Sequence, residues 1–311
     1  MTKRLSEQFT TRAMRLYAVF VVLYVLLIVI LPANKQAMHS YHLSALEYRI
    51  LYFAVAIPAV VVWFAAFFGY AKLQEYAASI KGSPEADAFT QLARGCRWLA
   101  WSLPVPAIIA IVLNSIANSW PSFQSAATIL DNYVTVIFSL IAFSVIGFAS
   151  RELVKHAKVQ FSTTSARGIM LVFVVGGVAY CYLTFRRFDP SSLGSTNNPY
   201  ALPIWLLLLT VIIPYLYAWF VGLLAAYEIT TYIKQVRGIL YKQALHLLVS
   251  GLLAVIIGSI ALQYISSVTP SPGHLALNYR LLLILLFRAV DGVGFVLIAI
   301  GALRLRKIEE V

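Results

Sequence analysis

Runs of about 20 mostly apolar residues recur along the whole length of this 311-residue sequence. A helix of that length crosses the hydrocarbon core of a bilayer, which is about 30 Å thick. Such runs lie at approximately 14–32, 48–71, 98–118, 132–150, 168–187, 202–226, 244–266 and 280–303. They predict an all-α, polytopic integral membrane protein with about eight transmembrane helices. We expect the second and sixth helices to continue to about Ile80 and Val236.

The small share of charged residues supports this prediction and excludes a soluble fold. Only 12% of the residues carry a charged side chain, whereas 61% are hydrophobic. Soluble domains carry roughly 25% charged residues, which they need to cover their surface. The lipid bilayer is therefore the partner that the composition predicts.

Lysine and arginine cluster in every second loop between the apolar runs. If the N-terminus is cytoplasmic, 18 of the 24 Lys and Arg residues lie on the cytoplasmic side, as the positive-inside rule requires. We therefore expect a multi-pass protein of the plasma (cytoplasmic) membrane, of the bacterial inner-membrane type, with both termini in the cytoplasm. The net charge of +12 then reflects topology, and we expect no binding to nucleic acid. The cytoplasmic set is Lys3, Arg4, Arg12, Arg15, Lys72, Lys81, Arg94, Arg97, Arg151, Lys155, Lys158, Arg167, Lys234, Arg237, Lys242, Arg304, Arg306 and Lys307.

The second and sixth runs align with each other at an offset of 156 residues, about half the chain. The shared residues include proline, tryptophan and a closing glycine, although apolar helices often resemble one another by composition alone. If the similarity reflects a repeat, the chain consists of two tandem four-helix units, 1–160 and 161–311. The units would be in parallel orientation, related by an axis along the membrane normal. The matched positions are Ile57-Pro58 with Ile213-Pro214, Trp63-Phe64 with Trp219-Phe220, Tyr76 with Tyr232, and Gly82 with Gly238.

Arg288 and Asp291 lie near the middle of the last apolar run. Either charge at the centre of a bilayer costs roughly 2.5–3.5 kcal/mol, so the two must pair or must face protein or water. Their i, i+3 spacing puts them on one helix face, where they can pair. Gly292 and Gly294 beside them allow a neighbouring helix to approach closely. The pair predicts either a substrate, ion or proton site between the two units, or an ion pair that only fixes helix packing.

A second group of charged residues lies near the predicted outer surface. Glu47 and Arg49 open the second span, and Asp131 opens the fourth. These residues could form a charged outer vestibule. The alternative is that the carboxylates stabilise the N-terminal ends of their helices through the helix dipole.

Four prolines interrupt the predicted spans. Proline removes a backbone donor and frees a carbonyl group, and broken helices in matching places of two halves indicate a binding site in many transporters. Pro58, Pro104, Pro106 and Pro214 are therefore candidate hinges. Kinks that only shape helix packing are the alternative.

The sequence lacks the residue patterns of the common cofactor and metal sites. Cys96 and Cys181 lie at different predicted depths, so we expect two free thiols. Of the histidines only His246 falls inside a span, and no span contains a central lysine. We therefore expect no cofactor, no metal and no catalytic residue. The first apolar run ends without a small-residue cleavage pattern, so we expect it to be retained.

Three classes of function are compatible with these features. The first is a small-solute or ion transporter or channel, with Arg288 and Asp291 as its polar element near the bilayer midplane. The second is a membrane scaffold, assembly factor or receptor that binds a membrane partner without transport. The third is a membrane enzyme that acts on lipid. A homo-oligomer is compatible with each of them.

Overall fold

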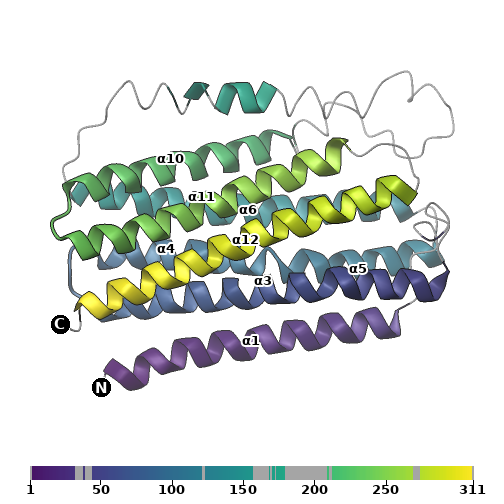
Figure 1. The fold of residues 1–311 in the computed structure, drawn as a ribbon, viewed down its shortest axis with the longest axis horizontal. Helices are drawn as coiled ribbons and strands as arrows, with labels where there is room; N and C mark the ends of the chain where they lie inside the picture. Colours follow the sequence, from purple (N-terminus) through teal and green to yellow (C-terminus); the bar gives the residue numbers. More distant parts are fainter. Residues whose placement is uncertain are drawn as a thin grey trace.

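A computed structural model describes residues 2–31, 38, 44–120, 123–156, 168, 170–171, 173–178, 209, 212–268 and 274–309 of the chain. The described residues form an all-helical bundle without a strand element (Figure 1). Its helices, in chain order, are α1 (Thr2–Ile30), α3 (Ala45–Ser79), α4 (Ala86–Trp101), α5 (Pro104–Ser119), α6 (Gln124–His156), α10 (Ile213–Gln235), α11 (Ile239–Val268) and α12 (His274–Glu309).

Seven helices within the described residues are long and apolar enough to cross a membrane, with α4 and α5 together making one of them. They account for seven of the eight predicted spans. The predicted fifth span, 168–187, lies largely outside the described residues, although residues 173–178 within it are helical. As expected, the second and sixth helices continue to Ser79 and Gln235.

The outer faces of the helices carry large apolar side chains. Val22 and Ile30 of α1 are 58% and 71% exposed, and Val293 of α12 is 58% exposed. Soluble monomers rarely expose continuous apolar surface on this scale. The bundle therefore presents a surface suited to lipid, which agrees with a membrane-embedded protein.

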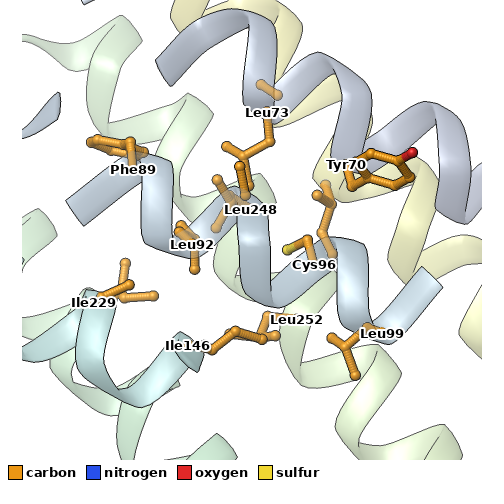
Figure 2. Close-up of a cluster of buried hydrophobic side chains, with 14 of the residues drawn as sticks. Tyr70, Leu73, Phe89, Leu92, Cys96, Leu99, Ile146, Ile229, Leu248 and Leu252 are labelled. Carbon is orange, nitrogen blue, oxygen red and sulfur yellow. The ribbon is translucent and has the colours of Figure 1, made fainter. Parts of the chain in front are cut away.

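Helix α4 supplies the centre of the core (Figure 2). Its side chains Leu92, Cys96 and Leu99 are each at most 4% exposed. They lie among labelled side chains from four other helices: Tyr70 and Leu73 of α3, Ile146 of α6, Ile229 of α10, and Leu248 and Leu252 of α11. Cys96 is a free thiol, as predicted, and Cys181 lies outside the described residues.

The helices of each half pack against one another, and the two halves meet along two contacts. Helix α4 packs on α3 and α6, and α11 packs on α10 and α12. Between the halves, α3 packs along α12 and α10 packs along α6. The second helix of each half therefore contacts the fourth helix of the other half, and these two contacts join the halves into one body.

Glycines allow two of these helix pairs to approach closely. A Cβ atom on Gly95 of α4 would lie 3.1 Å from the Ala142 carbonyl oxygen and 3.2 Å from the Ile146 amide nitrogen of α6. On Gly251 of α11 it would lie 2.4 Å from the Gly294 carbonyl oxygen and 2.9 Å from the Ile298 amide nitrogen of α12. Small residues at such contacts let backbones meet, which is how many membrane helices associate.

Both termini and the two tightest turns lie at one end of the bundle (Figure 1). The turns follow α3 and α10, and each contains a glycine with a positive φ: Gly82 at +103° and Gly238 at +97°. Glycine adopts this conformation without the steric cost that a side chain would add. Helix α6 ends at this same end of the bundle, whereas α10 begins at the opposite end (Figure 1).

Candidate functional site

The predicted charge pair lies halfway along α12. Asp291 is the eighteenth of the 36 residues of this helix. The Arg288 Nη1 atom lies 3.6 Å from the Asp291 Oδ2 atom, as the i, i+3 spacing predicts. The Asp291 side chain is 5% exposed and the Arg288 side chain is 32% exposed. The pair therefore joins a buried carboxylate to a partly exposed guanidinium group.

One oxygen of this carboxylate has no hydrogen-bond partner. Among the described residues, nothing donates to Asp291 Oδ1. Asp291 packs against Gly258 of α11, where an added Cβ atom would lie 2.1 Å from Oδ1. A buried acceptor without a donor is costly, so this oxygen is a feature that packing alone does not explain.

The part of α12 that carries the charge pair packs against the neighbouring helices α3 and α11. Gly292 faces α3, where an added Cβ atom would lie 3.2 Å from Val62, and Gly294 meets Gly251 of α11. These contacts agree with the close approach predicted for both glycines.

The residues of the predicted outer vestibule lie on two helices, Glu47 and Arg49 on α3 and Asp131 on α6. Glu47 closes a capping box at the start of α3, since its carboxylate accepts from the Ser44 amide at 2.8 Å while Ser44 Oγ accepts from the Glu47 amide at 3.3 Å. This geometry agrees with the alternative that Glu47 stabilises the N-terminal end of its helix. Arg49 is exposed. Asp131 lies inside α6 and not at its start, because the helix begins at Gln124.

The four predicted hinge prolines occupy different helical positions. Pro58 lies inside α3, whereas Pro214 lies in the first turn of α10, where a missing amide costs no helical hydrogen bond. Pro104 begins α5, three residues after α4 ends at Trp101, and Pro106 follows in the same turn. The break in the third span is thus observed. Residues 210 and 211, just before α10, lie outside the described ranges, so the match of Pro58 with Pro214 stays a prediction.

Two buried glutamates were not identified from the sequence. Glu75 of α3 is 2% exposed and Glu228 of α10 is 5% exposed. Each contacts a hydroxyl group and an arginine from another helix. A comparison of the two halves at an offset of 153 residues, instead of 156, would have paired these glutamates.

Glu75 is fully enclosed by donors. It accepts from Thr10 Oγ1 of α1, from Lys72 Nζ at 3.0 and 3.3 Å, and from Arg306 Nη1 of α12 at 2.9 Å. Two cations and one hydroxyl group therefore hold this carboxylate. Buried charges are tolerated when paired in this way.

Glu228 has fewer partners and lies in an open cleft. It accepts from Ser150 Oγ of α6, and its Oε1 atom lies 3.8 Å from Arg151 Nε, whose side chain is 59% exposed. A small cleft lies between α6 and α10, and its lining includes Glu228, Arg151 and Ala225.

A polar network connects the turn regions at the end of the bundle that holds the termini. The hydroxyl groups of Tyr76 (α3) and Tyr241 (α11) lie 3.2 Å apart. Tyr232 of α10 donates to Glu85, just before α4, at 2.6 Å. Within the described residues, no three His, Cys, Asp or Glu side chains gather closely enough to hold a metal ion.

Comparisons with protein-family models, with curated proteins and with solved structures found no match for this chain. The class of the protein therefore comes from its own fold. Its seven apolar helices and lipid-compatible surface define a polytopic helical membrane protein.

Proposed function

We propose that this protein is a transporter or channel for a small solute or ion, and that Asp291 and Arg288 form its polar element. The observation that carries the proposal is the unpartnered Oδ1 atom of Asp291, buried at the midpoint of α12. Ionisable residues inside a membrane span are costly and usually belong to ion or proton pathways.

The geometry assigns different roles to the two charges. Arg288 compensates Asp291 through Oδ2 at 3.6 Å, which leaves Oδ1 to accept a proton or to contact a small cation. The partial exposure of Arg288 gives the pair a connection to the surface. An ion pair that only fixed packing would have both oxygens satisfied, because an unmade buried hydrogen bond is destabilising.

We also propose that the chain consists of two tandem four-helix units, near 1–160 and 161–311. The glycine contacts support this organisation, because Gly95 and Gly251 are 156 residues apart and meet the pairs Ala142/Ile146 and Gly294/Ile298 in the same way. The polar network supports it too. Tyr76 and Tyr232 are 156 residues apart, as are their partners Glu85 and Tyr241.

A second register supports the equivalence of α3 and α10. At an offset of 153 residues, Glu75 matches Glu228 and Phe67 matches Phe220. Phe20 contacts Phe67 with ring centres 5.9 Å apart, and Phe173 contacts Phe220 at 4.9 Å. The offset is 156 residues at Trp63/Trp219 and again at Tyr76/Tyr232, but 153 residues at the two glutamates between them. The two registers differ by nearly one helical turn.

The proposed membrane topology has eight spans, with both termini in the cytoplasm of a cell with a bacterial-type inner membrane. Helices α6 and α10 have a fifth predicted span between them, and they end and begin at opposite ends of the bundle (Figure 1). One further crossing between them accounts for this arrangement. The clusters of Lys and Arg in alternate loops assign the end with the termini to the cytoplasm.

The transport proposal can be tested by flux in proteoliposomes. A panel of monovalent ions, protons and small solutes is measured with the wild type, with Asp291→Asn, and with the double variant Arg288→Ala plus Asp291→Ala. We expect both variants to lower the rate of the transported species by about tenfold or more, the factor that about 1.4 kcal/mol of lost stabilisation produces.

Ser139→Ala is the matched control, because Ser139 is a buried residue near the middle of the fourth span. Among the described residues, its hydroxyl group donates within its own helix, at 3.0 Å to the Thr135 carbonyl oxygen. Its flux should equal that of the wild type. If the wild type moves nothing in the panel, or if the Asp291 variants move it equally well, the transport proposal is wrong. The scaffold, assembly-factor or receptor class and the class of a lipid-acting membrane enzyme would then remain.

A further inference from the structure

The two buried glutamates of the proposed units differ in one neighbouring residue. In the first unit, Lys72 lies one turn before Glu75 and bonds both of its carboxylate oxygens. At the offset of 153 residues, the position of Lys72 is taken by Ala225 in the second unit. Ala225 lines the cleft that opens on Glu228. The cleft thus lies at the position where the first unit has the ammonium group of Lys72 and the second unit has none.

The remaining partners of Glu228 do not replace this ammonium group. Ser150 supplies a hydroxyl group, and Arg151 approaches only to 3.8 Å, whereas Arg306 approaches Glu75 to 2.9 Å. The side chain of Glu228 is only 7% exposed. Its carboxylate can therefore pair with one more cation that carries hydrogen-bond donors.

The other residues that line the cleft indicate which kind of molecule would carry this cation. Arg151 is 59% exposed at the cleft, so it can bind an anionic group next to the ammonium group. Phe148 and Tyr217 also line the cleft and are 65% and 51% exposed. Both provide apolar surface beside the charges, on a face suited to lipid.

We propose that the cleft between α6 and α10 binds a primary ammonium group on Glu228 and the anionic group of the same molecule on Arg151. A phosphoethanolamine headgroup has this chemistry, either in a bilayer phospholipid or in a soluble compound. The comparison of Glu75 with Glu228 rests on the proposed two-unit organisation. The site itself does not involve Asp291, so binding and flux can fail independently.

Binding is measured with the full-length protein in nanodiscs and by native mass spectrometry. Phosphatidylethanolamine is compared with phosphatidylcholine, whose quaternary ammonium group donates no hydrogen bond. We expect phosphatidylethanolamine to be retained and to raise the unfolding temperature, since a ligand that binds the folded state stabilises it. Phosphatidylcholine should have neither effect. Soluble phosphoethanolamine forms a separate arm, and an equal response to it would assign the site to a soluble ligand.

Two variants address the site directly. Glu228→Gln should weaken phosphatidylethanolamine binding by about tenfold or more. Ala225→Lys should abolish binding, because it supplies the missing ammonium group from the chain, and it should raise the unfolding temperature without lipid. Glu152→Gln, at a neighbouring exposed glutamate paired with Lys155, is the matched control and should bind as the wild type does.

Ala225→Lys keeps the charge of Glu228, so it tests the site even if Glu228→Gln does not fold. The proposal is overturned if the wild type binds neither phosphatidylethanolamine nor soluble phosphoethanolamine, or if it binds phosphatidylcholine as well as phosphatidylethanolamine. It is also overturned if Ala225→Lys retains the affinity of the wild type.

Discussion

At the scale of single residues, three buried carboxylates of the described part of the chain have different surroundings. Glu75 has two cations and a hydroxyl group. Glu228 has one hydroxyl group and a more distant arginine. Among the described residues, Asp291 has an arginine contact and one oxygen without a donor. The two proposed ligand sites are therefore the two carboxylates with fewer partners in the described structure.

Replacing Glu75 by alanine should destabilise the protein strongly. The change leaves Lys72 and Arg306, whose side chains are 16% and 23% exposed, without their shared carboxylate. Removing one partner of a buried ion pair costs about 3–5 kcal/mol. Thermal unfolding in mild detergent would measure this loss.

The control for this change is Glu152→Ala, because the side chains of Glu152 and Lys155 are 44% and 70% exposed. Exposed pairs contribute about 1 kcal/mol or less. Equal loss of stability in the two variants would show that the ion pairs of Glu75 do not hold α3 against α12.

At the scale of helices, the approach of α11 and α12 depends on glycine. Gly251→Ala would place a methyl group 2.4 Å from the Gly294 carbonyl oxygen, so the helix backbones must separate. Overpacking of this kind costs about 1–3 kcal/mol. We expect a lower unfolding temperature, together with reduced flux if Asp291 depends on the same interface.

Gly176→Ala is the matched control, because an added Cβ atom at Gly176 has no neighbour within 4 Å among the described residues. Its unfolding temperature should stay the same or rise slightly, since alanine favours helix over glycine. A similar loss in both variants would contradict a specific role for the contact at Gly251.

The helices were predictable from the sequence because apolar runs of membrane length carry a strong signal. The position of Arg288 beside Asp291 was also predictable, since it depends only on helical spacing. The sites at Glu75 and Glu228 were not, because their partners Arg306 and Ser150 come from distant segments of the chain. The match of Pro58 with Pro214 stays a prediction, because Pro214 follows directly on residues outside the described ranges.

At the scale of the whole molecule, the proposed topology determines which turns face which compartment. Cysteines placed at Lys81 and Arg237 should be labelled only from the cytoplasmic side, because both turns lie at the end of the bundle with the termini (Figure 1). A cysteine at Trp120, which is 68% exposed, should react with an impermeant maleimide from outside intact cells.

The labelling uses a background in which Cys96 and Cys181 are replaced by alanine. Reaction of position 81 from outside would reverse the proposed orientation. Opposite reactivity at positions 81 and 237 would instead change the number of spans between them.

The contact between α3 and α12 has a consequence for biosynthesis. Glu75 is synthesised with α3, but Arg306 follows it 231 positions later in the chain. Until α12 is synthesised, the carboxylate of Glu75 lacks its partner Arg306, and the surface of α3 that α12 will cover stays open. We expect the insertion machinery or a chaperone to shield this surface until the last helix arrives, and a nascent chain stalled before α12 to be a substrate for proteolytic quality control.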